Sequence, residues 1–343
     1  MLSIDERAGQ DLAEDQDKPR DPSRPPTMAD IAKLAGVTAI TVSRALKDNT
    51  VVALETRERI RRIAAEQGYR LNVDARRLRL KRSHTIAVIV DMRATSERPM
   101  SGPYPLGLIG GILQRLSERR YSMLLTTLKT LDRDGIGHAD GAILLGQGAN
   151  DAAVQLLEQY SVPFVVWGAG HGGRNHVFVG SDNIEAGKTV AARFYRQGRT
   201  APLFLGDPDY PEISDRFDGF ASAFDGREVR LVRCAFDFAE ARRKIGRLLD
   251  AGEQVDAILA ANDLMAAGAL RAATDRGLNV PEQLSIVGFD DSPVALTTEP
   301  PLTSVAQNWS EGGLILADRI LAVVAGKRTT SHSLPTALVE RQT

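Results

Sequence analysis

The stretch GAGHGG, residues 168–173, has the glycine spacing of a loop that cradles the phosphates of a dinucleotide. Such a loop must lead at once into a helix whose N-terminus holds the pyrophosphate. The residues that follow, RNHVFVG, alternate like a strand instead. We therefore expect a turn between two strands here and no dinucleotide site.

The other reactive side chains also lack a catalytic pattern. Asp290 and Asp291 could form a metal-binding or acid–base pair, but neighbouring residues on a strand point to opposite faces. Cys234 is the only cysteine, so it excludes an intramolecular disulfide and a thiolate zinc site, and we expect it to be a small buried apolar residue. The histidines show no metal-ligand spacing: His84, His138, His171, His176 and His332. We expect no enzyme, cofactor or metal.

Three short helices are predicted between Thr27 and Tyr69. Thr27 and Asp30 have the spacing of a capping box, Gly36 ends the first helix, and Thr38 can cap the second. A third helix is expected over about residues 54–67. A helix, a tight turn and a second helix fit a helix-turn-helix, whose second helix enters the DNA major groove, although an ordinary three-helix bundle is the alternative.

The charge distribution favours the DNA-binding alternative. Residues 27–84 carry 13 basic and 6 acidic side chains, a net charge of +7, whereas residues 85–343 carry a net charge of −5. A basic module on an acidic body indicates a polyanionic partner for that module alone.

Motifs spaced along the chain resemble the lactose-repressor-type (LacI/GalR) family of transcriptional regulators. The resemblance begins in TMADIAKLAGVTAITVSRALKDNTVVALETRERIRRIAAEQGYRLNVDARRLR and continues through DGAILL, VGSDN, RFDGF, AILAANDLMAAGAL, VPEQLSIVGFDD and PLTSVAQ. It covers roughly residues 27–343. It implies a helix-turn-helix head over residues 27–70, a hinge over 71–84 and an effector-binding and dimerisation body over 85–343.

The resemblance also implies which head residues contact DNA. Ala39, Ile40 and Arg44 occupy its base-reading positions, and Thr38, Thr41 and Ser43 lie where hydroxyl groups meet phosphates. An apolar side chain can read the C5-methyl group of thymine, and an arginine can pair with guanine through two hydrogen bonds. The alternative for Ile40 is packing against the first helix.

The basic segment 70–84 matches the family's hinge helix, which would fold when two copies meet in the minor groove. The resemblance assigns Asn72, Ala75, Arg76 and Leu78 to this contact, with Leu78 wedged between base pairs. A solvated tether is the alternative. Two residues depart from the family pattern, since Ala53 replaces a capping serine and Lys47 replaces a common asparagine.

Beyond residue 84 the chain alternates strand-like and helical runs. The strand-like runs are TIAVIV, YSMLLTTL, GAILL, PFVVW, HVFVG, APLFLG, AILAAN and LSIVGF. This alternation predicts parallel, doubly wound α/β sheets with helices on both faces. We expect two periplasmic-binding-protein-like subdomains, about 85–181 and 184–304, with later crossovers. Residues 129–140, between LLTTL and GAILL, are too few for a full crossover helix, so this helix is expected to be lost or shortened.

Two such sheets form a cleft at the carboxyl ends of their strands. The resemblance selects Asp182, Arg216, Asn262 and Asp290 as effector contacts, and their chemistry suits a polyol or sugar. A structural ion pair is the alternative for Arg216 and Asp290, and helix capping is the alternative for Asn262 and Asp182. Aromatic candidates for the cleft wall are Trp167, Trp309 and Phe289, with core packing as their alternative.

The sequence thus predicts a ligand-responsive transcriptional regulator, expected to be a repressor of carbohydrate-metabolism genes that binds palindromic operator DNA as a homodimer. Residues 1–26 are expected to be a disordered leader without a secretory signal, and the protein is expected in the cytoplasm, away from membranes. A secreted sugar-binding receptor without DNA function is the first alternative. An enzyme built on the same body is the second.

Overall fold

The structure is a computed structural model that describes residues 24, 26–47, 49–69, 82–91, 100–128, 130, 136, 138–160, 162–170, 176–224 and 228–343. The chain divides into two units, Met1–Lys81 and Arg82–Thr343, here called the head unit and the body unit. Of the expected leader 1–26, only residues 24 and 26 are described.

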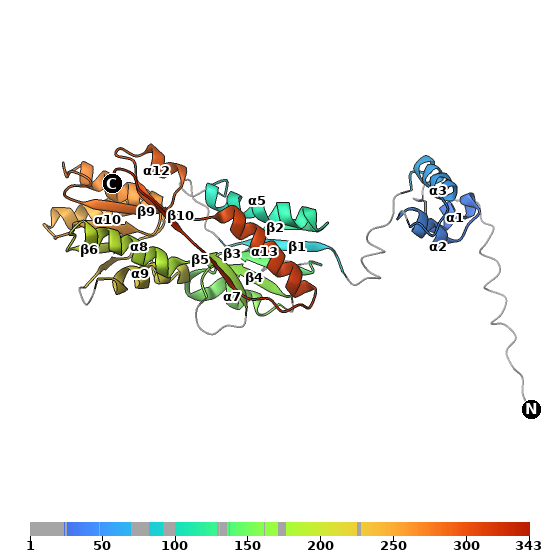
Figure 1. Cartoon of the computed structure of the whole chain (residues 1–343), viewed down its shortest axis with the longest axis horizontal. Helices are drawn as coiled ribbons and strands as arrows, with labels where there is room; N and C mark the ends of the chain where they lie inside the picture. The colour runs from blue at the N-terminus through green and yellow to red at the C-terminus, as the bar shows by residue number, and fades with distance from the viewer. Residues whose placement is uncertain are drawn as a thin grey trace, which may run out of the picture. The chain divides into compact units, whose positions relative to one another are not determined.

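The described part of the head unit consists of α1 (Met28–Ala35), α2 (Ala39–Ala45) and α3 (Leu54–Glu66) (Figure 1). Thr27 and Asp30 form the expected capping box on α1, and Gly36 ends α1 with a φ of 64°, which glycine adopts without strain. Thr38 caps α2 by accepting a hydrogen bond from the backbone N–H of Thr41. The helices therefore begin and end where the sequence predicts.

A small apolar core joins the three helices. Ile31, Val42, Ala45 and Ile60 are fully buried, one or two from each helix. Tyr69 packs against the same cluster. α3 lacks a side-chain cap because its N-cap residue is Ala53, which has no hydrogen-bonding side chain.

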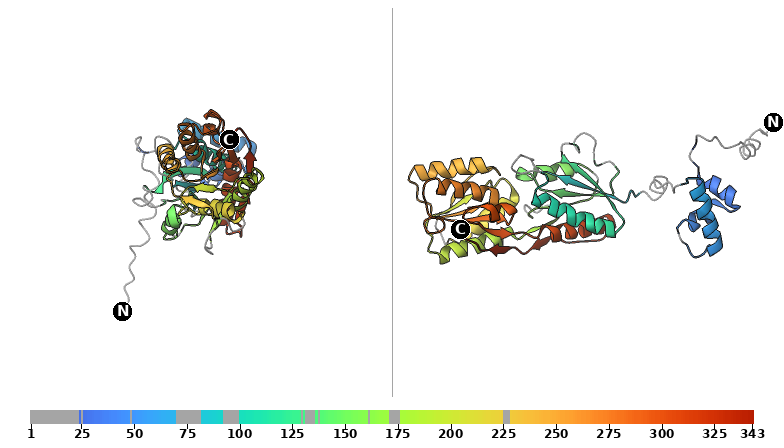
Figure 2. Two further views of the ribbon diagram at one scale, coloured as in Figure 1. Left: turned by 90° about the vertical axis from the view of Figure 1, so that its left-hand side faces the viewer. Right: turned by 90° about the horizontal axis from the view of Figure 1, so that it is seen from above.

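Within the described residues the body unit contains two six-stranded sheets, each the centre of one lobe (Figures 1 and 2). The first lobe has the strand order β11-β5-β4-β3-β1-β2, and the second has β12-β10-β9-β8-β6-β7. Their bounds in the first lobe are β1 Thr85–Val90, β2 Ser122–Thr127, β3 Gly141–Leu145, β4 Phe164–Trp167, β5 Val177–Ser181 and β11 His332–Leu334. In the second they are β6 Pro202–Leu205, β7 Arg230–Val232, β8 Ala257–Ala260, β9 Ser285–Asp290, β10 Thr303–Ala306 and β12 Ala337–Val339.

The pairings are parallel, as predicted, except that β12 runs antiparallel to β10. The chain crosses between the lobes after β5, after β10 and between β11 and β12. Strand β11 therefore completes the first sheet although it follows the second lobe in sequence. These crossovers join the two lobes through three adjacent segments.

Helices cover both faces of each sheet. In the first lobe, α5 (Pro103–Glu118) and α13 (Trp309–Val324) pack on one face, and α7 (Ala152–Leu157) packs on the other. In the second lobe α8 (Asn183–Arg196) pairs with α9 (Pro211–Ser222), and α10 (Phe238–Asp250) pairs with α11 (Asp263–Thr274). Figure 2 shows these two pairs on opposite sides of the second sheet. The short elements are η1 (Ala149–Asp151) and α12 (Pro293–Thr297).

Strand β1 shows why the predicted strands are apolar at consecutive positions of the sequence. Ile86, Val88 and Val90 face the α5 and α13 side, whereas Ala87 and Ile89 face the α7 side, and all five are buried. A parallel strand covered on both faces needs apolar residues at every position. The edge strand β2 differs, since Leu124 and Leu125 remain about half exposed.

Two sequence predictions concern the segments beside this lobe. The loop GAGHGG is followed by β5 and not by a helix, as predicted, although residues 171–175 are outside the described part. The shortened crossover 129–140 lies largely outside the described residues, which include only 130, 136 and 138–140 of it. Among the described helices, none combines the length and the apolar character that a bilayer crossing needs.

Candidate DNA-binding and effector sites

The exposed face of α2 carries the side chains predicted to contact DNA. Val42 and Ala45 point into the head core, which leaves Ala39, Ile40 and Arg44 on the outer face. Ile40 is 64% exposed, so it does not pack against α1, and its alternative assignment as a core residue of the head is wrong. An exposed isoleucine beside an exposed arginine is suited to reading a methyl group and a guanine edge.

Hydroxyl groups lie at the start of the same helix. Thr38 is exposed, Thr41 and Ser43 are partly exposed, and the Thr38 and Thr41 Oγ1 atoms lie 2.9 Å apart. Together with the free backbone N–H groups of a helix N-terminus, they can donate to a phosphate. The predicted hinge residues Asn72, Ala75, Arg76 and Leu78 lie outside the described residues.

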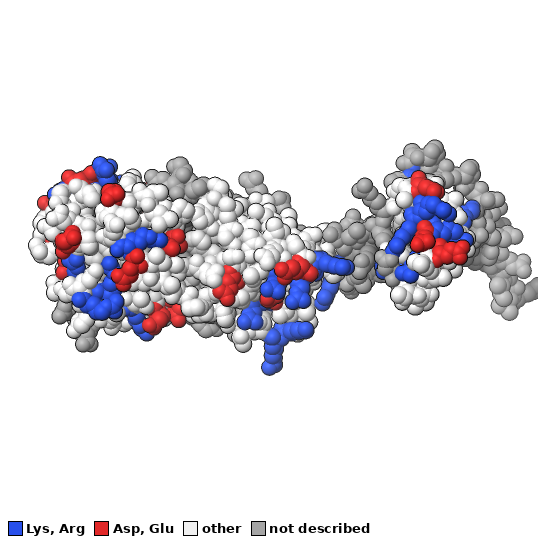
Figure 3. All heavy atoms as spheres, turned by 45° about the horizontal axis from the view of Figure 1, so that its top comes forward, with Lys and Arg blue, Asp and Glu red and all other residues white. Residues whose placement is uncertain are grey.

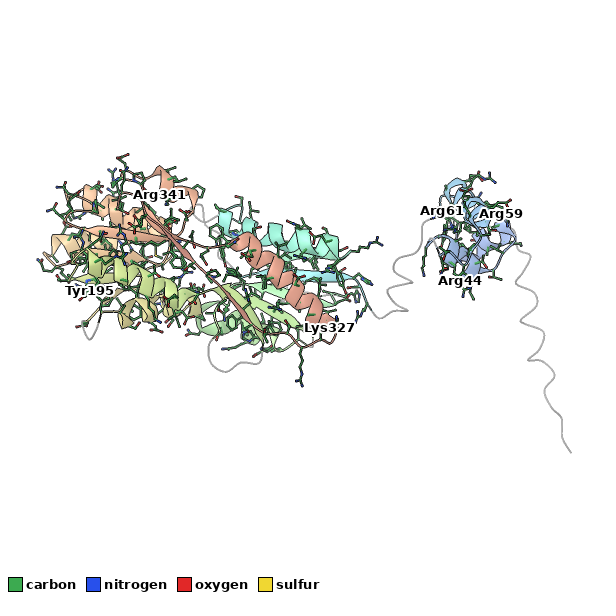
Figure 4. All side chains as sticks on the ribbon, in the orientation of Figure 1. Arg44, Arg59, Arg61, Tyr195, Lys327 and Arg341 are labelled. Carbon is green, nitrogen blue, oxygen red and sulfur yellow. The ribbon has the colours of Figure 1, made fainter. Side chains whose placement is uncertain are left out.

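Basic side chains also gather on the head unit. Figure 3 shows Lys and Arg side by side on its visible face, with Asp and Glu beside them, and Figure 4 shows Arg44 on α2 and Arg59 and Arg61 on α3. Arg59 and Arg61 are exposed on α3. A positive surface of this kind attracts a polyanion at long range.

A cavity of about 380 Å³ lies within the body unit at the carboxyl ends of several strands. Its walls come from the ends of β4, β5, β8 and β9, the start of α5, the first turns of α9 and α11, and the crossover after β10. This is the position that doubly wound sheets offer to a small ligand, because loops diverge there. The polar and aromatic residues of the lining include Trp167, Ser181, Asn183, Glu212, Arg216, Asn262, Asp263, Asp290, Ser292, Gln307 and Trp309.

Arg216 reaches the cavity from α9 and is held rigidly. It is 6% exposed, its Nε donates to Asn183 Oδ1 at 2.8 Å, and its Nη1 donates to the Ala261 carbonyl at 2.7 Å. Its guanidinium carbon lies 3.6 Å from the centre of the Phe289 ring. A fixed guanidinium in a cavity wall can donate to a ligand hydroxyl without losing side-chain entropy on binding.

Asn262 lines the cavity, and it also caps α11 through a 2.9 Å bond from Met265 N to its Oδ1. The carboxylate of Asp182 caps α8 by accepting from Glu185 N, its side chain is exposed, and it is not among the cavity-lining residues. The predicted effector contact of Asp182 is therefore not supported by its position.

Asp290 ends β9 and faces the cavity in a left-handed backbone conformation, with a φ of 105°. Gln307 joins it to the first lobe: Gln307 Nε2 donates to Asp290 Oδ1, and Ser181 Oγ donates to Gln307 Oε1, both at 2.6 Å. The neighbouring Asp291 turns away and pairs with Arg341 at 2.6 Å. The two adjacent carboxylates therefore have separate environments, as predicted, although Asp291 lies just beyond the end of β9 and not on the strand.

Asp263 is a cavity residue that the sequence analysis did not select. Ser304 Oγ donates to its Oδ1 at 2.5 Å, and Ser292 N donates to its Oδ2 at 2.7 Å. Burial raises the pKa of Asp263 to about 7, and the nearby Asp290 carboxylate adds to the rise, whereas the bonds from Ser304 and Ser292 oppose it. In the sequence its only signal is its place directly after Asn262, which is equally typical of an ordinary helix start.

The aromatic candidates divide between wall and core. Trp167 and Trp309 line the cavity, and Trp167 is also packed in the first-lobe core. Phe289 is fully buried, and its ring packs against the guanidinium of Arg216 rather than lining the cavity. Tryptophan faces in a cavity wall are suited to stacking on the apolar face of a sugar ring.

The thiol of Cys234 lies in the core of the second lobe. Cys234 is 2% exposed, and burial raises its pKa to about 12, so the thiol is unreactive at neutral pH. Among the described residues, no group of three or more His, Cys, Asp and Glu side chains has the arrangement of a metal site.

Two segments of the chain match known families. Residues 27–72 match bacterial regulatory proteins of the lacI family, and residues 191–343 match a periplasmic binding protein-like domain. A helix-turn-helix head joined to such a body defines a DNA-binding transcriptional regulator.

Relatives extend this match to nearly the whole chain. The HTH-type transcriptional regulator CelR of Thermobifida fusca is 32% identical over 321 residues, which span 89% of this chain and 94% of the relative. The chain belongs to the lacI family of bacterial regulatory proteins, and its relatives are regulators rather than enzymes.

Solved structures agree in fold. A CelR–cellobiose complex is 31% identical, has a TM-score of 0.69 and covers 92% of this chain and 99% of that one. A lac repressor dimer bound to operator and the anti-inducer ONPF is 23% identical, has a TM-score of 0.80 and covers 93% and 99% of the two chains. The second likeness concerns the fold alone.

Proposed function

We propose that this regulator is a repressor of carbohydrate-metabolism genes, which binds a palindromic operator as a homodimer and responds to a sugar held in the body-unit cavity. The observation that carries the proposal is the cavity itself. It places the fixed guanidinium of Arg216, the amide of Asn262 and the carboxylate of Asp290 around one space of about 380 Å³. These groups can bind paired hydroxyls, and Trp167 and Trp309 supply apolar faces.

The comparison with the CelR–cellobiose complex supports a sugar as the ligand, since that complex resembles this chain over 92% of its length. Binding in the cavity would change the contacts between the lobes, because Gln307 links Ser181 of the first to Asp290 of the second. A ligand that competes for Asp290 shifts the balance between lobe arrangements. By linkage, operator DNA must then change the ligand affinity by the same factor.

We assign Ala39, Ile40 and Arg44 to contacts with base edges. We assign Thr38, Thr41 and Ser43 to contacts with DNA phosphates. The exposure of this face of α2 supports the assignment. Residues 71–84 would form the hinge, with Asn72, Ala75, Arg76 and Leu78 entering the minor groove. A single short helix buries too little surface for operator affinity, so two heads must act together.

A surface on the first lobe suits a second copy of the chain. Leu106 and Leu113 lie seven residues apart on α5 and are about half exposed, as is Leu125 on the edge strand β2, which pairs with Val88 and so faces the α5 side. Exposed leucines at this density favour burial against a partner. We assign this surface to the homodimer, in which two-fold symmetry matches a palindromic site.

Selection of binding sites from random duplex DNA tests the proposal directly. We expect a palindromic consensus, bound by two chains per duplex in analytical ultracentrifugation, and a change in affinity when cellobiose or another sugar is added. An asymmetric consensus bound by one chain would contradict the dimer. Absence of any selected sequence would contradict the regulator itself.

The substitution Leu78→Ala tests the assignment of Leu78 to the hinge. If Leu78 wedges between base pairs of the operator, the substitution weakens binding to the selected site far more than binding to unrelated duplex. Both affinities are measured by fluorescence anisotropy at one salt concentration. Equal weakening of the two would remove the wedge from the account.

A further inference from the structure

Two cavity-lining residues each have one buried polar atom without a hydrogen-bond partner within the described part of the chain. The two atoms are Oε2 of Glu212, in the first turn of α9, and Nε1 of Trp309, at the start of α13, and both atoms are buried from solvent. A buried polar atom that lacks a partner costs free energy. Glu212 therefore favours a ligand group that donates a hydrogen bond, and Trp309 favours one that accepts.

Acidic side chains outnumber basic ones in the described lining of the cavity. Among the described lining residues, Glu212, Asp263 and Asp290 are acidic, and Arg216 is the basic one. Arg216 already donates through Nε and Nη1 to Asn183 and Ala261, so its guanidinium is held in one position by the protein. Asp263 keeps its proton to about pH 7 because burial and Asp290 disfavour a further negative charge there.

We propose that Glu212 determines the charge class of the effector, so that the cavity accepts an uncharged polyhydroxy ligand and excludes the corresponding carboxylate. The inference rests on the proposed function of the cavity as the effector site. It deepens that function by assigning a specificity-determining residue that is distinct from Arg216, Asn262 and Asp290.

The physical reason lies in the donor and acceptor requirements of the two unpartnered atoms. A hydroxyl group can donate to Glu212 and accept from Trp309, so a sugar satisfies both atoms. A ligand carboxylate can accept from Trp309, but at neutral pH it has no proton to donate to Glu212, whose negative charge repels it. A ligand ammonium group could donate to Glu212 but leaves the indole N–H of Trp309 without an acceptor.

Matched pairs of sugars test this inference on the full-length protein. Each pair consists of a neutral sugar and its C6-oxidised acid: glucose with glucuronate, galactose with galacturonate, and cellobiose with the disaccharide acid oxidised at one C6. Titration calorimetry at pH 7.5 is expected to show at least one neutral sugar binding, with its acid partner at least about tenfold weaker. Glu212→Gln, which keeps the shape and removes the charge, is expected to reduce that ratio by about tenfold.

Asp218→Asn is the matched control. Asp218 lies on the same helix α9, is exposed and does not line the cavity, so the variant loses the same charge but is expected to keep the wild-type ratio. Operator binding in the absence of sugar is measured for both variants to show that they are folded. A ratio unchanged in Glu212→Gln, or reduced equally in Asp218→Asn, would overturn the role of Glu212.

The remaining outcomes separate this inference from the proposed function. An acid that binds as tightly as its neutral partner would overturn the exclusion of carboxylates while leaving a sugar effector in place. If none of the probes bound while operator binding persisted, the inference and the sugar assignment would both fail. The assignment as a DNA-binding regulator would stand in that case.

Discussion

At the scale of single residues, the fold raises the pKa of Asp263 well above that of an ordinary aspartate. Its carboxyl group is buried at the start of α11, receives hydrogen bonds from Ser304 and Ser292, and has its pKa raised to about 7 by burial and by Asp290. In the unfolded chain the same group has its ordinary pKa of 3.8. Folding is therefore linked to the protonation of this side chain.

This linkage predicts how the stability of the protein changes with pH. Between about pH 4 and pH 7 the folded state holds a proton that the unfolded state has lost, so the free energy of unfolding falls as the pH rises. Asp263→Asn does not titrate and escapes this fall. Chemical denaturation should therefore show wild-type stability decreasing relative to Asp263→Asn by roughly 2 to 4 kcal/mol from about pH 4.5 to pH 8. A difference that stays constant over this range would contradict the raised pKa.

A comparison of Asp182 with Asp263 shows what single residues in the sequence can and cannot reveal. Each precedes or begins a helix after a strand, and the pattern around each favours capping and ligand binding alike. Asp182 is exposed and Asp263 is buried in the cavity wall, a difference set by the crossover after β5 and by the packing of β9 and β10. Such long-range packing is not encoded in the local pattern, so Asp263 was missed.

At the scale of elements, α3 differs from the other two described helices of the head unit because its N-terminus has no side-chain cap. Thr27 and Thr38 cap α1 and α2 with side-chain oxygens, whereas Ala53 leaves the first N–H groups of α3 without a side-chain partner. The departure from the family pattern at this position was visible in the sequence, and the structure gives its consequence. The helix depends instead on the burial of Ile60 and Ala64.

Ala53→Ser should therefore stabilise the head unit. A serine at the N-cap can accept from an N–H group in the first turn of α3, which contributes about 0.5 to 1 kcal/mol. Hydrogen exchange of the α3 amides is expected to slow correspondingly. Thr27→Ala, which removes the capping box of α1, serves as the opposite control and should accelerate exchange in α1. Unchanged or faster exchange of α3 in Ala53→Ser would count against the missing cap.

Helix pairs in the body unit approach closely at glycines. A Cβ atom at Gly219 of α9 would lie 2.1 Å from the backbone carbonyl oxygen of Ile184 in α8, and α8 has its own close contact at Gly187. This approach positions α9, which carries both Arg216 and Glu212. The alternation of strands and helices predicted these elements, but the distance between two helices depends on which face each one turns inward.

Gly219→Ala should lower the free energy of unfolding of the body unit by about 1 to 3 kcal/mol, because backbone atoms must shift to accommodate the methyl group. It should also weaken effector binding through the displacement of α9. Asp218→Ala, at the exposed neighbouring position, is expected to change stability by no more than about 0.5 kcal/mol. Thermal denaturation and calorimetry compare the two variants, and equal stability would show that α8 and α9 are not closely packed there.

At the scale of the whole molecule, the order of elements from β1 to β9 largely followed the sequence prediction. The strand-like runs TIAVIV to LSIVGF became strands of parallel sheets, and most of them are covered on both faces, whereas the edge strand β2 stays partly exposed. The short strands β7, β10, β11 and β12 were not predicted, since three or four residues give no detectable alternation. Helix α13 was also missed, although its 16 residues complete the first lobe.

The crossovers explain why the cavity could be predicted only in part. Arg216, Asn262 and Asp290 came from motifs within one lobe, and the structure places all three in the cavity wall. Gln307 and Ser181 meet only because the chain returns to the first lobe after β10. A contact between residues so distant in sequence depends on topology that local patterns do not determine.

The central claim is that the basic head binds duplex DNA and that the occupant of the body-unit cavity changes this binding. One measurement tests it most directly: anisotropy titrations of the full-length protein against its selected duplex over a range of salt concentrations, with and without a bound sugar. The account predicts an affinity that falls steeply as salt increases and shifts by about fivefold or more when the sugar binds. No salt-dependent binding, or an affinity that the bound sugar leaves unchanged, would contradict it.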